Sequence, residues 1–301
     1  MAVRKIEGDT VSIASSPKSK SEKNSQRSEV SLEDMKKLEL AILKEVDSIC
    51  RANNFRYSII GGTLLGAVRH HGFIPWDDDV DLVMPRPDFD RLVAYCKKNK
   101  TNFELKCIQT DHRYGSLHAK ACDRSTILVD ENVGNRWNCE FGVFIDIFPL
   151  DGLGNTREKA LKNFRKGTFK RELLVAANWK KYFRSRTHAW YYEPVRFGMY
   201  VISRKVSNYK LITDIEKELR KIPFDLVKYC APMSGSYRER EIMPTKFYNN
   251  TIELEFEDTK FLAIRDYDKY LSSVYGNYME LPPVEKRKTH HTFTPYWKEE
   301  E

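Results

Sequence analysis

The sequence predicts an α+β fold in which a mixed sheet and its helices occupy residues 29–155 and a mostly helical, basic lobe occupies residues 156–301. Three observations predict this. Stretches with the two-residue apolar period of strands alternate with stretches of helical period, and several predicted strands follow one another with no helix between them. From residue 157 onward, helical spacing and aromatic residues dominate. Residues 1–28 are rich in Ser, Lys and Glu, which is typical of a disordered tail.

The first helix has the clearest boundaries. Ser31 and Asp34 form a capping box, apolar residues recur at helical spacing from Leu32 to Ile49, and the helix is expected to end near Asn53. The other main predicted elements are strands at residues 57–60, 80–84, 103–109, 117–123, 141–148 and 251–256, and helices at residues 88–99 and 266–275.

The positive charge of the chain is concentrated in one region. The 301 residues carry a formal net charge of +8, and residues 162–210 contain 13 Lys and Arg but only two acids. Nucleic acid, an anionic membrane surface or a phosphate-bearing substrate each fits such a balance. No apolar stretch approaches the roughly 18 residues of a spanning helix, and the charged start differs from a secretory signal. We therefore expect a cytoplasmic protein that can bind peripherally at the inner face of the membrane.

Six cysteines are scattered along the chain without a Cys-x-x-Cys pair. This spacing fits neither a structural zinc site nor a disulfide scaffold, so reduced thiols are expected.

The strongest functional signal is a group of four acids within five residues, at positions 77, 78, 79 and 81. Asp79 and Asp81 flank Val80 at the start of a predicted strand, where alternate side chains share a face. Their mutual repulsion calls for a cation, and hard divalent ions prefer oxygen ligands. A solvated acidic turn is the alternative, but Trp76 and the apolar strand that follows the acids argue against it.

Two further features accompany the acids. Gly61 and Gly62 lie where a strand meets a helix, which offers backbone N–H groups to an anion, although a simple tight turn is the alternative. Asp146 is the single charge in an apolar strand, where a buried, unpaired carboxylate would cost several kcal/mol. It is a candidate third metal ligand, or the base for an acceptor hydroxyl. A strand-end residue paired with a surface Arg is the alternative.

Two basic positions are less specific. Lys120 lies on a predicted strand and is a candidate partner for phosphate, with a strand-edge lysine facing water as an equal alternative. His290 and His291 are adjacent, so in an extended chain they point to opposite faces and chelate one ion poorly. Substrate contact or packing is therefore favoured for His290.

These motifs together resemble the LicD-type phosphotransferases of the nucleotidyltransferase-fold superfamily, which are related to the fukutin group. Bacterial members move phosphocholine from CDP-choline onto cell-surface glycans, and animal relatives transfer ribitol phosphate from CDP-ribitol. The resemblance covers about residues 30–295. It is carried by residues 61–69, 72–81, 146–151 and 275–283, with Thr289, His290 and His291.

The resemblance implies a metal-dependent enzyme that releases CMP. Asp79 and Asp81 would hold Mg²⁺ or Mn²⁺, and Asp146 would complete the metal site or take the hydroxyl proton. Gly61 and Gly62, with Arg69, would position the donor phosphates. The acceptor would be a lipid-linked glycan, a precursor of teichoic acid or lipopolysaccharide. Choline is favoured over ribitol as the donor alcohol, partly because a quaternary ammonium binds aromatic faces, for which the candidates are Trp76 and Trp137.

Other functions also fit the sequence. A ribitol- or glycerol-phosphate transferase would use the same site, and so would a nucleotidyltransferase, which releases pyrophosphate instead of CMP. A different class is a basic nucleic-acid-binding protein that stacks bases on aromatic residues of the 162–210 region. Contact with an anionic membrane explains the same charge. We expect this region to contact an anionic membrane and not to bind nucleic acid. The stacking candidates are Trp179, Tyr182, Phe183, Trp190, Tyr191 and Tyr192.

Overall fold

The computed structural model describes residues 27–129, 139–184, 190–287, 289 and 293–299. The predicted tail falls almost entirely outside the described residues, as do Trp137, His290 and His291. The helices are α1 (Leu32–Asn53), α2 (Gly61–His70), α3 (Arg86–Lys98), α4 (Arg157–Lys166), α5 (Thr168–Asn178), α6 (Glu193–Ser203), α7 (Asn208–Leu219), α8 (Lys246–Asn249) and α9 (Tyr267–Tyr275).

The strands confirm the predicted mixed sheet. They are β1 (Ser58–Ile59), β2 (Asp81–Pro85), β3 (Phe103–Lys106), β4 (Ala119–Asp123), β5 (Thr126–Val129), β6 (Phe144–Gly154), β7 (Tyr229–Pro232), β8 (Met243–Pro244), β9 (Thr251–Phe256), β10 (Thr259–Ile264) and β11 (Thr294–Trp297). In the described part of the chain, nine of them form one sheet with the order β3-β4-β6-β2-β1-β10-β9, and β7 and β8 continue from β6. Among the pairs that the described residues form in this sheet, β2–β6 and β1–β10 are parallel and the others are antiparallel. The β5 and β11 strands form a separate pair.

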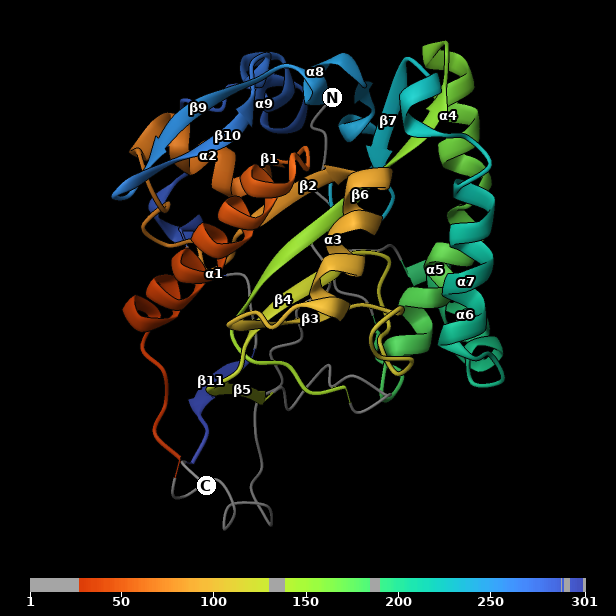
Figure 1. The fold of residues 1–301 in the computed structure, drawn as a ribbon. Helices are drawn as coiled ribbons and strands as arrows, with labels where there is room; N and C mark the ends of the chain where they lie inside the picture. Colours follow the sequence, from red (N-terminus) through yellow and green to blue (C-terminus); the bar gives the residue numbers. More distant parts are fainter. Residues whose placement is uncertain (1–26, 130–138, 185–189, 288, 290–292, 300–301) are drawn as a thin grey trace.

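Helices α1 and α3 lie across one face of this sheet (Figure 1). The α1 helix begins as predicted, because the Ser31 hydroxyl accepts a hydrogen bond from the Asp34 amide at 3.1 Å. It ends at Asn54, whose left-handed backbone (φ 52°) is typical of a helix C-cap. Its apolar stripe joins the strands in the main hydrophobic core, where Leu43 and Val46 are fully buried.

A second core lies beside the first. Helices α4, α5 and α7 stand as a group at the β6–β7 side of the sheet (Figure 1) and enclose Phe164, Leu174 and Ile212. The segment after residue 156 is therefore mostly helical, as predicted. The same segment also supplies β7, β8, β9 and β10 to the main sheet, and of these only β9 was predicted.

Strand β6 is longer than the predicted 141–148 because Pro149 does not end it. Proline cannot donate to a sheet ladder and normally stops a central strand. On one side of β6, the pairing with β4 ends at Ile147 and the pairing with β7 starts at Leu150. Pro149 falls between these two pairings, where the ladder on that side requires no N–H donor. The strand therefore continues to Gly154.

A buried ion-pair network joins β6 to α3 and α7. The Arg86 guanidinium donates two hydrogen bonds to Asp151, at 2.8 and 2.7 Å, and lies 3.3 Å from Glu216. Arg86 and Asp151 are 6 % and 1 % exposed, so each charge depends on the other for the solvation that water no longer supplies.

We predict that Asp151→Asn lowers the free energy of unfolding by about 3 kcal/mol, because it leaves the buried Arg86 charge without its bidentate partner. Urea unfolding checks this. The matched control is Asp90→Asn, which removes the exposed carboxylate that pairs with Arg220 and should cost about 0–1 kcal/mol. Equal losses in the two variants would contradict the importance of the buried network.

Candidate active site

Two predicted site carboxylates lie side by side on neighbouring strands. Asp81 at the start of β2 is directly opposite Asp146 on the parallel strand β6. The Asp146 amide donates to the Val80 carbonyl at 2.8 Å, and the Asp81 amide donates to the Thr63 hydroxyl at 2.8 Å. Val80 is fully buried, as predicted. Asp79 precedes β2, which begins one residue later than expected, so the Asp79 side chain extends from the loop.

The start of α2 lies directly against these acids. Gly61 has a left-handed backbone (φ 58°), and a Cβ atom there would lie 2.9 Å from an oxygen of Asp81. A Cβ atom on Gly62 would lie 2.4 Å from an oxygen of Asp77. The left-handed backbone therefore favours glycine at position 61, and a side chain at position 62 would displace the Asp77 carboxylate. The partial positive charge of the α2 N-terminus favours these carboxylates. The structure thus brings the glycines to the acids, and their contact with donor phosphates stays a prediction.

The surroundings of Asp81 disfavour its charged form. Its pKa is raised well above the usual value, first by burial and then by the neighbouring carboxylates of Asp79, Asp146 and Asp77, with Lys120 acting in the opposite direction. Oxygen donors with an excess of negative charge suit a hard divalent cation. In the part of the chain that the structure describes, however, no three His, Cys, Asp or Glu side chains are arranged to hold a metal ion together.

Lys120 forms an ion pair with Asp146, the third predicted metal ligand. Its ammonium lies 2.6 Å from an Asp146 carboxylate oxygen and 3.4 Å from the centre of the Phe144 ring. The Lys120 side chain is 17 % exposed. Neither alternative from the sequence holds, since Lys120 does not face water and the Asp146 partner is a lysine rather than a surface arginine. Lys120 contacts one oxygen of Asp146, and the three carboxylates would have to rearrange to share a metal ion.

His118 lies beside the same carboxylate and was not predicted from the sequence. Its Nε2 atom is 3.4 Å from Asp146, and its Nδ1 atom is within 3.1 Å of the Ser116 and Ser234 hydroxyls. Burial lowers the pKa of His118 to about 4, so the imidazole is neutral at physiological pH. Lys120 is therefore the charged partner of Asp146.

Arg69 and Trp76 lie near the site and also contact the 275–287 segment. Arg69 donates to the Tyr278 carbonyl at 2.9 Å, and burial lowers its pKa. The Arg287 guanidinium lies 5.2 Å from the centre of the Trp76 ring, and His70 meets the same ring edge-on. The two sequence motifs at residues 61–81 and 275–283 are thus adjacent in space.

Glu39 on α1 is an acid that the sequence analysis missed. It is 2 % exposed, and its Oε2 atom has no hydrogen-bond partner among the described residues. Burial, followed by the charges of Asp79 and Asp78, raises its pKa well above the usual value. A signal was present, because Glu39 occupies a position on the apolar stripe of α1, four residues after Met35.

Tyrosines from the far end of the chain complete the surroundings. The rings of Tyr237 and Tyr275 meet at 70° with centres 5.0 Å apart. The pKa of Tyr237 is raised by burial first and then by acids that include Asp81 and Asp79. Tyr275 belongs to a motif noted in the sequence, whereas nothing in the sequence singled out Tyr237.

We predict that Asp81→Asn melts at the same or a higher temperature than the wild type in metal-free buffer, because the variant removes one of several repelling charges. Differential scanning calorimetry with a chelator checks this. In Mg²⁺ at 100 times its dissociation constant, the wild type should gain about 2.7 kcal/mol and the variant much less. Asp258→Asn, at an exposed ion pair with Lys44, is the control and should gain as the wild type does. A lower melting temperature without metal would contradict the repulsion.

Comparisons with known proteins show what the region around these acids is similar to. The family model for the LicD/FKTN/FKRP nucleotidyltransferase domain matches residues 54–176, which contain the four acids and Asp146. The chain is 29 % identical over 265 residues to the lipopolysaccharide cholinephosphotransferase LicD of Haemophilus influenzae, covering 85 % of this chain and 94 % of that protein. It is also 47 % identical over 47 residues to uncharacterized proteins of Rickettsia prowazekii and Rickettsia typhi, covering 16 % of this chain and 18 % and 15 % of theirs. The resemblance predicted from the motifs is confirmed, because residues 54–176 match the model of this domain family and the chain is similar to LicD over most of its length.

Proposed function

We propose that this protein is a phosphotransferase that moves phosphocholine from CDP-choline to a hydroxyl group of a cell-surface glycan and releases CMP. The observation that carries the proposal is the pairing of Asp81 with Asp146 at the start of α2, within a domain of this family. The Haemophilus relative, named as a lipopolysaccharide cholinephosphotransferase, supports choline as the alcohol and favours lipopolysaccharide over teichoic acid as the acceptor class.

The carboxylates define the reaction centre. Asp79, Asp81 and Asp146 would hold Mg²⁺ or Mn²⁺, which neutralises the negative charge of the donor diphosphate during transfer. The acceptor oxygen forms a bond to the phosphorus that bears choline, and the bond between this phosphorus and the bridging oxygen breaks, so CMP leaves with that oxygen. Asp146 accepts the hydroxyl proton or completes the metal site, and Lys120 stabilises its charged form until substrate arrives.

The donor would lie between α2 and the 275–287 segment. Arg69 is anchored there by the Tyr278 carbonyl and adds a positive charge beside Asp77, so with the Gly61–Gly62 backbone it is suited to a phosphate. Trp76 already has the Arg287 cation near its ring, which supports its use for the trimethylammonium group of choline.

A donor screen tests the proposal. With Mg²⁺ and a glycan acceptor, we expect CMP release from CDP-choline, slower release from CDP-ribitol and CDP-glycerol, and no pyrophosphate from nucleoside triphosphates. Asp79→Asn and Asp81→Asn should each lose nearly all turnover while remaining folded, and Asp258→Asn should keep it. Faster turnover of CDP-ribitol or CDP-glycerol would overturn the assignment of choline as the donor alcohol but not the phosphotransferase reaction. Pyrophosphate release, or full activity of either site variant, would overturn the reaction.

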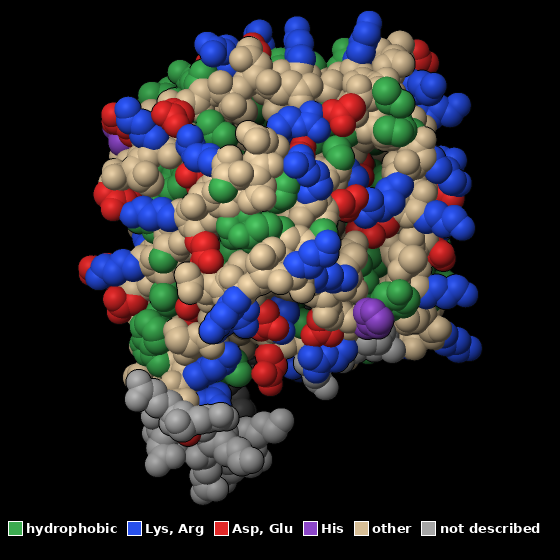
Figure 2. Space-filling view, viewed as in Figure 1, with side chains coloured by type: hydrophobic (Ala, Val, Ile, Leu, Met, Phe, Trp, Pro, Cys, Tyr) green, Lys and Arg blue, Asp and Glu red, His purple; other side chains and the backbone are tan. Residues whose placement is uncertain are grey.

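We also propose that the α6 region contacts an anionic membrane, where a lipid-linked acceptor would lie. In the described part of the chain, no helix is long and apolar enough to cross a bilayer. The short helix at Trp190–Tyr192 and the following α6 nevertheless expose many apolar side chains, and Trp190 is 83 % exposed. Figure 2 shows Lys and Arg side chains along the edge formed by the α4–α7 helices. The other exposed apolar residues are Tyr191, Tyr192, Val195, Phe197, Val201 and Ile202.

An exposed aromatic and aliphatic surface bordered by cations is typical of proteins that bind at the membrane interface. We predict sedimentation with vesicles that contain phosphatidylglycerol and much weaker sedimentation with phosphatidylcholine alone. Binding should weaken steeply with salt, because exposed charges are screened over about 8 Å at physiological ionic strength. The double variant Trp190→Ala/Phe197→Ala should bind less, whereas Leu226→Ala, an exposed apolar residue on another element, should bind normally. Equal binding to neutral vesicles would contradict the charge contribution.

A further inference from the structure

A row of polar side chains crosses the sheet away from the reaction centre. Lys106 on β3 is directly opposite Lys120 on β4, Lys120 is opposite Asp146 on β6, and Asp146 is opposite Asp81 on β2. Directly opposed residues of neighbouring strands project to the same face of a sheet. Because strands are spaced by about 4.8 Å, Lys106 lies about 14 Å along this row from Asp81.

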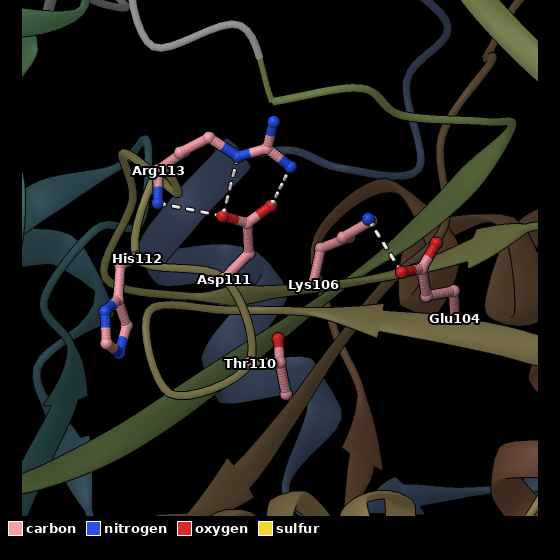
Figure 3. Close-up of a pocket in the computed structure, with 6 residues that line it drawn as sticks. All are labelled: Glu104, Lys106, Thr110, Asp111, His112 and Arg113. Carbon is pink, nitrogen blue, oxygen red and sulfur yellow. Dashed lines mark hydrogen bonds and ion pairs between the residues drawn. The ribbon is translucent and has the colours of Figure 1, made fainter.

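A cavity of about 540 Å³ lies at the far end of the row. Its lining comes from β3 and the turn that follows, namely Glu104, Lys106, Thr110, Asp111, His112 and Arg113. Figure 3 shows two ion pairs at its wall, with His112 directed away from both. Lys106 lies 2.7 Å from Glu104, and the Arg113 side chain donates two hydrogen bonds to Asp111, at 3.0 and 2.8 Å.

The turn that carries these groups is held in place by its own hydrogen bonds. The Thr110 hydroxyl donates to the Leu105 carbonyl at 2.8 Å and accepts from the Cys107 amide at 2.9 Å. The Asp111 amide donates to the Cys107 carbonyl at 2.8 Å. This turn ends β3 at Lys106, three residues earlier than predicted. The polar groups are therefore fixed before a ligand binds, which lowers the entropic cost of binding.

The chemistry of the lining favours an uncharged, hydroxyl-rich ligand. Two acids and two cations balance, so the cavity offers both donors and acceptors without the positive excess that a phosphate group would require. At one side of the turn, the His112 ring packs on Tyr209 with ring centres 4.4 Å apart. Sugar hydroxyl groups match paired carboxylate and guanidinium groups, since each hydroxyl both donates and accepts.

We propose that this cavity binds a sugar unit of the acceptor glycan at a distance from the hydroxyl group that receives phosphocholine. The inference rests on the proposed function, which places the reacting hydroxyl at Asp146. The row from Asp146 through Lys120 to Lys106 spans two strand spacings, so this sugar unit would lie about 10 Å from the reacting hydroxyl. Binding energy gained at the cavity would hold the reacting end in place, so the cavity would select long acceptors over single sugars.

The test uses deacylated lipopolysaccharide that lacks phosphocholine, so that no bilayer is involved. Arg113→Ala and Asp111→Asn should raise the KM for this glycan about tenfold, whereas the KM for CDP-choline stays within twofold. The matched control is Arg165→Ala, because Arg165 is an exposed arginine with the same two-bond contact to a carboxylate, that of Glu239. It should leave both constants unchanged. Wild-type melting temperatures in all three variants show that the fold is intact.

Binding measurements separate this inference from the proposed function. Calorimetry with the same glycan and no donor should show about tenfold weaker binding in Arg113→Ala than in wild type, whatever the donor proves to be. Equal glycan affinity in the two proteins overturns the cavity proposal, even if CDP-choline is turned over. Tight binding of inorganic phosphate that Arg113→Ala abolishes, with glycan affinity unchanged, would likewise overturn it. Absence of CMP release from the wild type would instead overturn the proposed function.

Discussion

The repulsion among the carboxylates around Asp81 is the constraint on which the site depends. Asp81 lies at the start of β2, against the first residue of α2 and opposite Asp146 on β6, and burial and the nearby acids raise its pKa. Burying one such charge is unfavourable, and burying it beside others is more so. The structure moderates this with the positive end of α2, the Lys120 ammonium and the close approach of the Gly61 and Gly62 backbone.

The same constraint explains why the supporting residues come from distant parts of the chain. Lys120 reaches Asp146 from β4, Glu39 faces the acids from α1, and Tyr237 and Tyr275 approach from segments near the C-terminus. Each of them changes the electrostatic environment of the acids. A row of polar side chains consequently runs along one face of the sheet from Asp81 to Lys106, which lines the cavity.

Short sequence motifs predicted the parts of the fold that depend on interactions between residues close together in the chain. The capping box at Ser31 placed α1, and the glycine pair and the acids placed the β1–α2 and β2 junctions within one or two residues. Contacts between distant segments had no comparable signal. The extension of β6 past Pro149 depends on β7 pairing, and the Lys120–Asp146 ion pair depends on the β4–β6 register. Glu39 was visible only as an acid on an apolar stripe.

The pairing of β1 with β10 has a consequence for how the site is assembled. Ile59 pairs with Ala263, so the two-residue strand beside β2 gains its second neighbour only from a segment about 200 residues later. Contacts between such distant segments form slowly, because the loop between them must close first. During synthesis at roughly 5–20 residues per second, the edge of β1 would stay exposed for at least about ten seconds after it leaves the ribosome. The carboxylates would therefore reach their final environment only after β10 has been synthesised.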